Sequence, residues 1–331
     1  MKKVIEGKAL GYLKSSLFPI LIYLLMLSIS LGMGKSAYYK ASAFDYIFSS
    51  SVLTVIMAYA IAIPLSGGRW DFAAGSISIL SGIIGCTIGI KYGQSLALAL
   101  FATIAVAVTL SLIEGIVYIF LRVSTTIVSL GIVMIYEALT SVVFDGEGVS
   151  LVKYKNMTIL DSSPWCYILL AVVIVMIWFL LYHTRFGLNS QSLGNNAGIA
   201  IASGIDQKKN ILLTYLVVGV LLGICGVLNA SSANVVPVSN LSSTDIMYSS
   251  MGPVLIGLFL GQFSDMPWGI LMGSIGMNAL SYGMVVLGLE GSIQQILTGV
   301  FIVFFMAYSA NRDIFKKMIL WKNLFAIKKE A

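Results

Sequence analysis

The sequence predicts an all-α integral membrane protein with about ten transmembrane helices. Hydrophobic residues make up 58% of the 331 residues, only 10% are charged, and the mean hydropathy is +0.95. A soluble domain carries roughly a quarter charged residues. Long apolar segments recur along the whole chain, and each approaches the ~20 helical residues that cross a bilayer core of ~30 Å.

Ten such segments follow one another with short connections between them. They lie near residues 15–33, 49–66, 72–90, 95–121, 124–144, 164–182, 211–232, 249–264, 268–288 and 292–310. Lysines precede the first segment in the manner of a signal peptide, but its length and the lack of a small-residue cleavage site favour an uncleaved span. The chain is therefore predicted to be one transmembrane domain over residues 1–331.

The distribution of basic residues predicts that both termini are cytoplasmic. With this topology, 15 of the 20 Lys and Arg residues fall inside, among them Arg69, Arg122 and a basic tail at 311–331. This bias follows the positive-inside rule. The net charge of +6 is thus a membrane-topology signal and not a sign of nucleic-acid binding. The external loops are expected at 34–48, 145–163 and 233–248, and the tail, with Trp321 and Phe325 among its lysines, is expected to contact anionic lipid.

Catalysis is poorly supported by the residues present. The single histidine, His183, ends an apolar segment, and no metal-ligand spacing or nucleophile motif occurs. Cys86, Cys166 and Cys225 lie far apart in apolar runs, so we expect them to be small core residues.

The longest polar interruption between apolar segments is the central loop at about 184–210. Within it, Asn195 or Asn196 can cap a short helix on which Ala197, Ile201 and Ile205 share one face. Gly204 can end that helix in the left-handed conformation. Either an ordinary interhelical loop or a docking site for a partner fits this pattern.

A second informative stretch, SGGRWDFAAGS at 66–76, separates two apolar segments. Its glycines break the helix and allow close backbone approach, and Asp71 can cap the helix that follows. Broken helices at membrane depth are tolerated where they are buried in protein or line a cavity. The stretch is therefore either part of a translocation path or a capped turn at the membrane face.

Two acidic residues, Glu114 and Glu137, fall inside apolar segments. A charge within the membrane is costly and marks a function or a buried partner by default. Each of them is either neutral or paired, for instance with Arg122. No series of ionisable groups crosses the membrane, which argues against a proton-coupled carrier.

Three motifs in order resemble the permeases of bacterial ABC importers, in the ribose and simple-sugar branch. Residues 66–76 are similar to the family's GGIDLSVGS with one extra residue at Arg69-Trp70, and HTRFG at 183–187 is similar to HTRLG. LGNNAGIAIASGI at 193–205 resembles GGNEEAARLSGI but lacks its acidic pair. The order and spacing persist over roughly residues 50–310. The family's ELDAIAAVVLGG is degraded here to TDIMYSSMGPVLIG at 244–257, so the chain is a diverged member.

The resemblance implies the function and the site residues. In this family the central loop docks on a cytoplasmic ATPase, which assigns the following coupling residues: Gly194, Asn195, Asn196, Ala197, Ile201, Ser203, Gly204 and Ile205. The translocation path is expected to include Gly67, Gly68, Asp71, Gly75, Ser76, Asn229, Asp245 and Asn278. The chain itself is not expected to be an enzyme or to bind a cofactor or metal, because ATP and Mg²⁺ belong to the ATPase subunit.

The implied partners are that ATPase, an extracytoplasmic solute-binding protein, a second permease (identical or different) and membrane lipid, at the bacterial cytoplasmic membrane. The solute is expected to be small and neutral, with a sugar favoured over nucleosides or branched-chain amino acids. An ion-driven carrier using Glu114 and Glu137, and a membrane scaffold without transport, are the alternatives from other classes.

Overall fold

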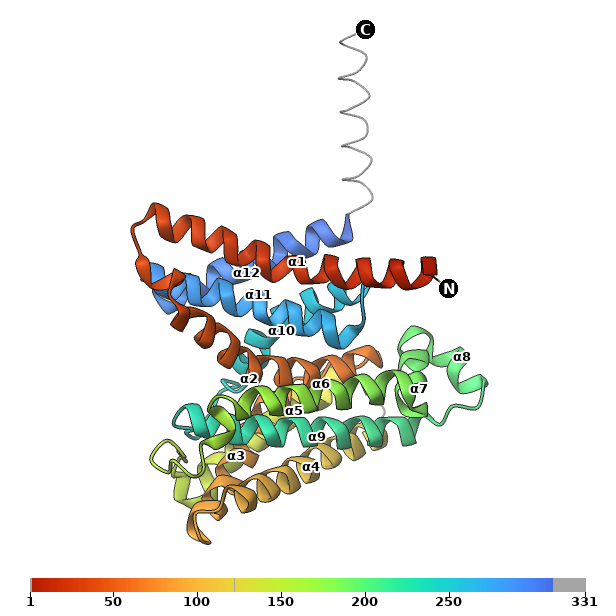
Figure 1. Cartoon of the computed structure of the whole chain (residues 1–331). Helices are drawn as coiled ribbons and strands as arrows, with labels where there is room; N and C mark the ends of the chain where they lie inside the picture. The colour runs from red at the N-terminus through yellow and green to blue at the C-terminus, as the bar shows by residue number, and fades with distance from the viewer. Residues whose placement is uncertain (1, 122, 312–331) are drawn as a thin grey trace. The chain divides into compact units, whose positions relative to one another are not determined.

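The computed structural model describes residues 2–121 and 123–311, with side chains from residue 9 onward. In this part the chain forms helices joined by short connections (Figure 1), and its β structure is limited to one isolated bridge between Val149 and Val235. The helices are α1 (Lys2–Gly32), α2 (Ala41–Ser66), α3 (Ala74–Lys91), α4 (Leu96–Leu121), α5 (Thr125–Val142), α6 (Trp165–His183), α7 (Arg185–Asn195), α8 (Ala197–Ala202), α9 (Gln207–Ser232), α10 (Thr244–Gly261), α11 (Met266–Leu287) and α12 (Gly291–Ala310).

Nine helices of the described residues are long and apolar enough to cross a membrane, which confirms the all-α membrane class. The tenth predicted span, at 249–264, corresponds to α10, which carries Pro253 and falls outside that set. The cytoplasmic location of both termini remains a prediction. The basic tail after residue 311, with Trp321 and Phe325, lies outside the described residues, as does Arg122.

The chain divides into two compact units. The first comprises residues 1–40 and 255–331, and the second comprises residues 41–254, so that the division falls within α10. A single permease domain over residues 1–331 remains a prediction.

In the first unit, α1 packs along α11. Tyr38 is fully buried between the rings of Tyr23 and Tyr282, at centroid distances of 5.0 and 5.9 Å, and its hydroxyl donates to the Ala279 carbonyl at 3.1 Å. A buried phenol needs such a partner, because an unpaired hydroxyl in an apolar interior is costly. The 3₁₀ turn Ser36–Tyr39 is thereby anchored to α11.

In the second unit, α9 is the central helix and packs against α2, α3 and α4. Glycines on α9 permit the close contact with α4. A Cβ at Gly219 or Gly223 would lie 2.6 Å from the Cα of Val108 or Ile104, respectively. Small residues at such crossings let helix backbones approach within a membrane, where the hydrophobic effect does not drive helices together.

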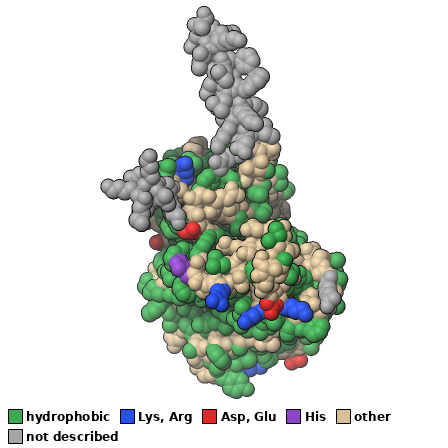
Figure 2. All heavy atoms as spheres, turned by 90° about the vertical axis from the view of Figure 1, so that its right-hand side faces the viewer, with side chains coloured by type: hydrophobic (Ala, Val, Ile, Leu, Met, Phe, Trp, Pro, Cys, Tyr) green, Lys and Arg blue, Asp and Glu red, His purple; other side chains and the backbone are tan. Residues whose placement is uncertain are grey.

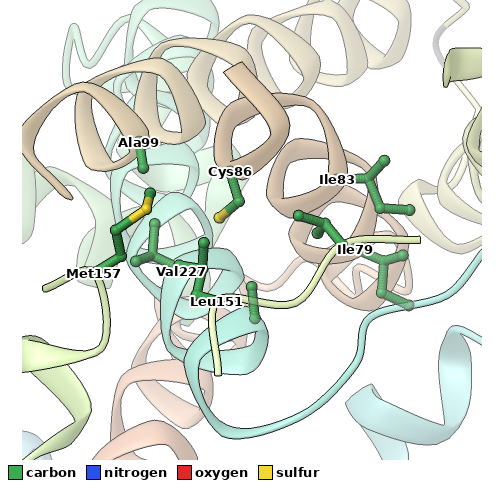
Figure 3. Close-up of a cluster of buried hydrophobic side chains, with 9 residues drawn as sticks. Ile79, Ile83, Cys86, Ala99, Leu151, Met157 and Val227 are labelled. Carbon is green, nitrogen blue, oxygen red and sulfur yellow. The ribbon is translucent and has the colours of Figure 1, made fainter. Parts of the chain in front are cut away.

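One end of the second unit is closed by the connection between α5 and α6, which folds back over α3 and α9. Leu151 and Met157 are fully buried in a cluster with Ile79, Ile83, Cys86, Ala99 and Val227, seen in Figure 3. The backbone N–H of Leu151 donates to the Ala230 carbonyl at 2.8 Å. The segment at 145–163, predicted as a solvated external loop, therefore has a buried apolar side.

Other predicted loops are shorter than the sequence indicated. Residues 41–48 belong to α2, and α10 already begins at Thr244, so the loops at 34–48 and 233–248 are partly helical. The predicted span began at Ser49, so the first two turns of α2 were assigned to the loop. Within α2, serine hydroxyls bond to carbonyls about one turn earlier, as Ser51 does to Ile47 at 2.6 Å. The three cysteines are free and buried, as predicted.

The buried side of the α5–α6 connection gives a stability test. Leu151→Ala removes a fully buried side chain and is expected to cost about 2–5 kcal/mol. The neighbouring Val152→Ala is the matched control, because Val152 is 55% exposed and a surface change costs within ~0.5 kcal/mol. Thermal unfolding of both variants in detergent measures the difference, and equal midpoints would mean that the loop does not contribute to the core.

Candidate functional site

The predicted coupling loop forms one end of the second unit, opposite the α5–α6 connection (Figure 1). It consists of α7, α8 and the start of α9. Figure 2 shows this end with Lys and Arg side chains among exposed hydrophobic ones. The exposed basic residues here are Arg185, Lys208 and Lys209.

The sequence of α8 specifies both of its ends. The Asn196 side chain accepts the Ile199 N–H at 3.1 Å, so Asn196, and not Asn195, is the N-cap. At the other end, Gly204 has φ of +90°, Gly204 N–H donates to Ile201 and Ile205 N–H donates to Ala200. This is the Schellman pattern.

The exposed face of α8 differs from the prediction. The helix ends at Ala202, so Ile205 lies beyond it and does not extend the face of Ala197 and Ile201. Ala200 is the buried residue, whereas Ile199 and Ile201 are 67% and 47% exposed. Two large apolar side chains, on different sides of this short helix, are thus exposed and available to a partner.

Helix α7 was not foreseen as a helix. Thr184 caps it by accepting the Gly187 N–H at 3.4 Å, and the amide of Asn210 on α9 donates to the Phe186 carbonyl at 3.2 Å. Helix α8 thus connects two helices, α7 and α9, that are joined to each other by a hydrogen bond.

The segment between α2 and α3, residues 67–73, is non-helical and largely buried. Its backbone remains satisfied, because the N–H groups of Gly67 and Arg69 both donate to the Pro64 carbonyl at 3.0 Å. Gly68 has φ of +75°, which a side chain would strain. We call residues 67–73 the break segment.

Arg69 in the break segment is only 3% exposed, and its Nη2 donates to Thr214 of α9 at 2.8 Å. Arg69, which the charge count placed on the cytoplasmic side, is therefore a buried side chain and not an exposed loop charge, while its side of the membrane remains a prediction. The break segment folds into the helix bundle, so this guanidinium is held by protein groups and not by water.

The coupling loop packs directly on the break segment. A Cβ added at Gly194 would collide with the Ser66 carbonyl oxygen and lie 3.3 Å from the Cα of Gly67. From the other side, a Cβ added at Gly68 would lie 3.7 Å from the Cα of Gly194. Two motifs more than a hundred positions apart in the sequence are thus in backbone contact.

Beyond the break segment, the start of α3 is held in a similar way. A Cβ at Gly75 would collide with the Ser243 carbonyl oxygen. The N–H groups of Ser243 and Leu241 donate to the two carboxylate oxygens of Glu137, each at 2.8 Å. Glu137 is 2% exposed and is fully provided with donors, so it fixes the turn before α10.

Asp71 does not cap α3 as predicted. Ala73 occupies the N-cap position, and Asp71 Oδ1 accepts its N–H at 2.8 Å. Burial raises the pKa of Asp71, although the Ala73 hydrogen bond and the charge of Arg69 oppose that shift. Asp71 also interacts with Glu114 of α4, which is fully buried. The suggested pairing of Glu114 with Arg122 remains a prediction, because Arg122 lies outside the described residues.

The other residues that were predicted to line the translocation path lie outside the break segment. Asn229 lies beside Ser78 at 3.5 Å, Ser76 donates to its own turn, and Asp245 is exposed. Asn278 belongs to the first unit, where its amide donates to the Ser274 carbonyl at 3.0 Å. The structure thus brings Gly67, Gly68, Asp71, Gly75 and Ser76 together on one segment and the others elsewhere.

Sequence reasoning missed Thr214, Ser243 and Leu241 as partners of this site. Thr214 lies inside an apolar run where a single threonine is unremarkable, and the other two act through backbone N–H groups that no side chain reveals. The only signal in the sequence was indirect: a buried charge needs hydrogen-bond partners, so polar residues had to lie near Arg69 and Glu137.

Comparison with known proteins identifies the family of this chain. Residues 43–306 match the family described as "Branched-chain amino acid transport system / permease component". The chain belongs to this permease family. It is 27% identical to the D-allose transport system permease protein AlsC of Escherichia coli (strain K12), over 73% of this chain and 78% of AlsC. It is 24% identical to the galactose/methyl galactoside import permease protein MglC of the same strain, over 82% and 87% of the two chains. The ribose import permease protein RbsC is also 24% identical, over 78% and 82%.

Membership in the family settles the class of this permease. It is a multi-pass protein of the bacterial cytoplasmic membrane and one component of an ATP-driven importer. As predicted, it is not itself the enzyme of that system. The family implies an ATPase subunit and a solute-binding protein as partners.

The contact between Gly194 and Ser66 predicts that alanine destabilises the protein at position 194 but not at position 198. Gly194→Ala is expected to cost about 1–3 kcal/mol, because a methyl group has no space beside the Ser66 carbonyl. Gly198→Ala is the control: its Cβ meets only Asn196 Oδ1 at 3.4 Å, and alanine favours a helix by up to ~1 kcal/mol. Thermal melts of both variants measure the contrast. A Gly194→Ala variant as stable as Gly198→Ala would show that the close contact is absent.

Proposed function

We propose that this permease imports a small neutral solute, a sugar, that an extracytoplasmic binding protein delivers. The proposal is supported by the relatives, whose names specify D-allose, galactose or methyl galactoside, and ribose. The family description names branched-chain amino acids instead. Such amino acids carry two charges that need buried counter-charges, and the charged side chains at the break segment are already engaged with one another.

The observation that carries the coupling part of the proposal is the backbone contact of Gly194 with Ser66 and Gly67. In this hypothesis the ATPase grips α8 through Ile199 and Ile201, and its movement reaches the break segment without an intermediate side chain. ATP and Mg²⁺ are bound by the ATPase and not by this chain. The assigned coupling residues run from Gly194 to Ile205.

The proposed solute path follows the break segment and the start of α3. Phe72 lies edge-to-face with Tyr248 of α10 at 6.1 Å, next to Asp71. Aromatic rings beside a few polar groups are typical of pockets that bind small uncharged ligands. Ser76 and Asn229 would supply hydrogen bonds, whereas Asp245 and Asn278 are assigned to the path by the family resemblance alone. A second permease, identical or different, and membrane lipid complete the proposed assembly.

The alternative of an ion-driven carrier has no support from Glu137. Its two oxygens are saturated by backbone N–H groups, so the carboxylate cannot exchange an ion without releasing the turn at 241–243. Nucleosides remain the alternative solute class, because they too are neutral and carry hydroxyl groups.

The ATPase-docking hypothesis predicts the effect of a charge on α8. Ile201→Asp leaves the fold intact because the side chain is 47% exposed, but it places a charge in the proposed apolar contact. We expect ATPase co-purification to fall tenfold or more, because the contact would remove the new charge from water. A tenfold loss of affinity corresponds to ~1.4 kcal/mol of binding free energy. Lys153→Asp, at an exposed position of the α5–α6 connection, is the control. If Ile201→Asp binds the ATPase and supports uptake like the control, α8 is not the docking site.

The transport hypothesis predicts that solute entry depends on ATP and not on a proton gradient. Uptake of labelled ribose, galactose and allose should be measured in cells with and without the partner ATPase, and with an uncoupler when ATP is maintained. We expect uptake of at least one neutral sugar, lost without the ATPase and retained with the uncoupler. Uptake that survives without the ATPase but collapses with the gradient would favour the carrier instead.

A further inference from the structure

Glu114 is a buried acidic residue whose two carboxyl oxygens both lack a hydrogen-bond donor among the described residues. Its side chain is 0% exposed. Glu137, in the same unit and almost equally buried, receives two backbone N–H groups. An ionised carboxylate that is buried without donors is unfavourable by several kcal/mol. Glu137 therefore has the donors that an ionised carboxylate needs, and Glu114 has none among the described residues.

The carboxyl group of Asp71 lies within hydrogen-bonding reach of Glu114. Two ionised carboxylates offer only acceptors and repel each other, so this contact becomes a hydrogen bond only if one of them carries a proton. The two catalytic carboxylates of aspartic proteases share one proton for this reason. Asp71 is the member that is better suited to be ionised, because its Oδ1 already accepts the Ala73 N–H.

The charges around Asp71 and Glu114 are balanced when the two carboxyl groups together hold one proton, and not when they hold two or none. Arg69 interacts electrostatically with Asp71 and donates to Thr214, so its positive charge stays close to the pair. With a single proton on the pair, one guanidinium balances one carboxylate and the buried group is neutral. The other titratable groups that face the pair are Tyr215 on α9 and Tyr136 on α5, with Tyr118 on α4 near Arg69. Free tyrosines titrate near pH 10, so they are neutral at pH 7.

We propose that Asp71 and Glu114 form a proton-binding site that ties the break segment to α4. The bound proton lies between the two carboxyl groups and supplies the donor that Glu114 lacks. No group of three or more acidic, His or Cys side chains suited to a metal ion occurs among the described residues, and the proposed ligand of this two-carboxyl site is a proton. The inference does not depend on what the permease transports.

The infrared spectrum provides a test that a merely structural contact would not pass. A protonated carboxylic acid has a C=O stretching band that a carboxylate lacks. In the purified full-length protein at pH 7, we expect this band to be lost in both Glu114→Gln and Asp71→Asn, because each amide donates the hydrogen bond itself. Glu137→Gln is the matched control and should retain the band. Should one of the two pair variants fail to fold, the other provides the same result.

Stability gives a second, independent readout. The folded pair keeps a proton that the unfolded chain releases above about pH 4, so folded stability should decrease as pH rises from that point. We expect the unfolding temperature to fall less from about pH 6 to about pH 9 in Glu114→Gln than in the wild-type protein. The double variant Asp71→Asn/Glu114→Gln leaves Arg69 without a carboxylate, so its loss should exceed the sum of the two single losses.

Three results would overturn the proposal. The first is a carbonyl band that neither pair variant changes, and the second is additive losses with the same pH profile in all variants. The third is an unfolding temperature that rises with Na⁺ at constant ionic strength in the wild type but not in Glu114→Gln, which would make the ligand a metal cation. None of them bears on the uptake experiments, so the proton site and the transport function fail or stand separately.

Discussion

The burial of charge in the break segment is the constraint on which the rest of the second unit depends. A helix that stops between two apolar spans leaves backbone N–H groups and charged side chains in a poor solvent. Here the backbone groups turn back to Pro64, and Asp71 accepts the N–H of Ala73. The guanidinium of Arg69 needs both a hydrogen-bond partner and a nearby negative charge, and α9 and Asp71 supply them. The position of α9 is therefore tied to the chemistry of the break.

This requirement explains why glycines lie on both sides of the break. Polar atoms of a buried segment can be satisfied only if neighbouring backbones come within hydrogen-bonding distance, and side chains at the contact points would prevent it. Gly194 admits the Ser66 carbonyl and Gly75 admits the Ser243 carbonyl. Ser243 is in turn held by Glu137, so one carboxylate deep in the bundle orders the turn that contacts α3. Steric and electrostatic fit are two aspects of one arrangement.

The sequence was sufficient for the membrane-crossing helices but not for helix α7 or for the pairing of the helices. Apolar runs predicted nine of the membrane-crossing helices, and the local signals at Asn196 and Gly204 predicted the ends of α8. Helix α7 was missed because its residues are mostly polar and short-range patterns do not distinguish it from a loop. The two glutamates could be identified as costly but not paired, since Glu137 binds groups 104 and 106 positions away. Such partners depend on helix register, which no local pattern encodes.

The pairing that the sequence did not reveal determines how a movement of α8 would be transmitted. The break segment is held from both sides of the coupling loop: α7 contacts it through Gly194, and α9 contacts it through Thr214. The bond from Asn210 to Phe186 joins these two helices close to α8. A force on α8 therefore acts on two helices that cannot separate without breaking that bond. Since packed interfaces change between discrete arrangements and do not deform continuously, the proposed coupling would displace the break segment as a whole. The proposed proton site between Asp71 and Glu114 would then resist that displacement, because it ties the break segment to α4.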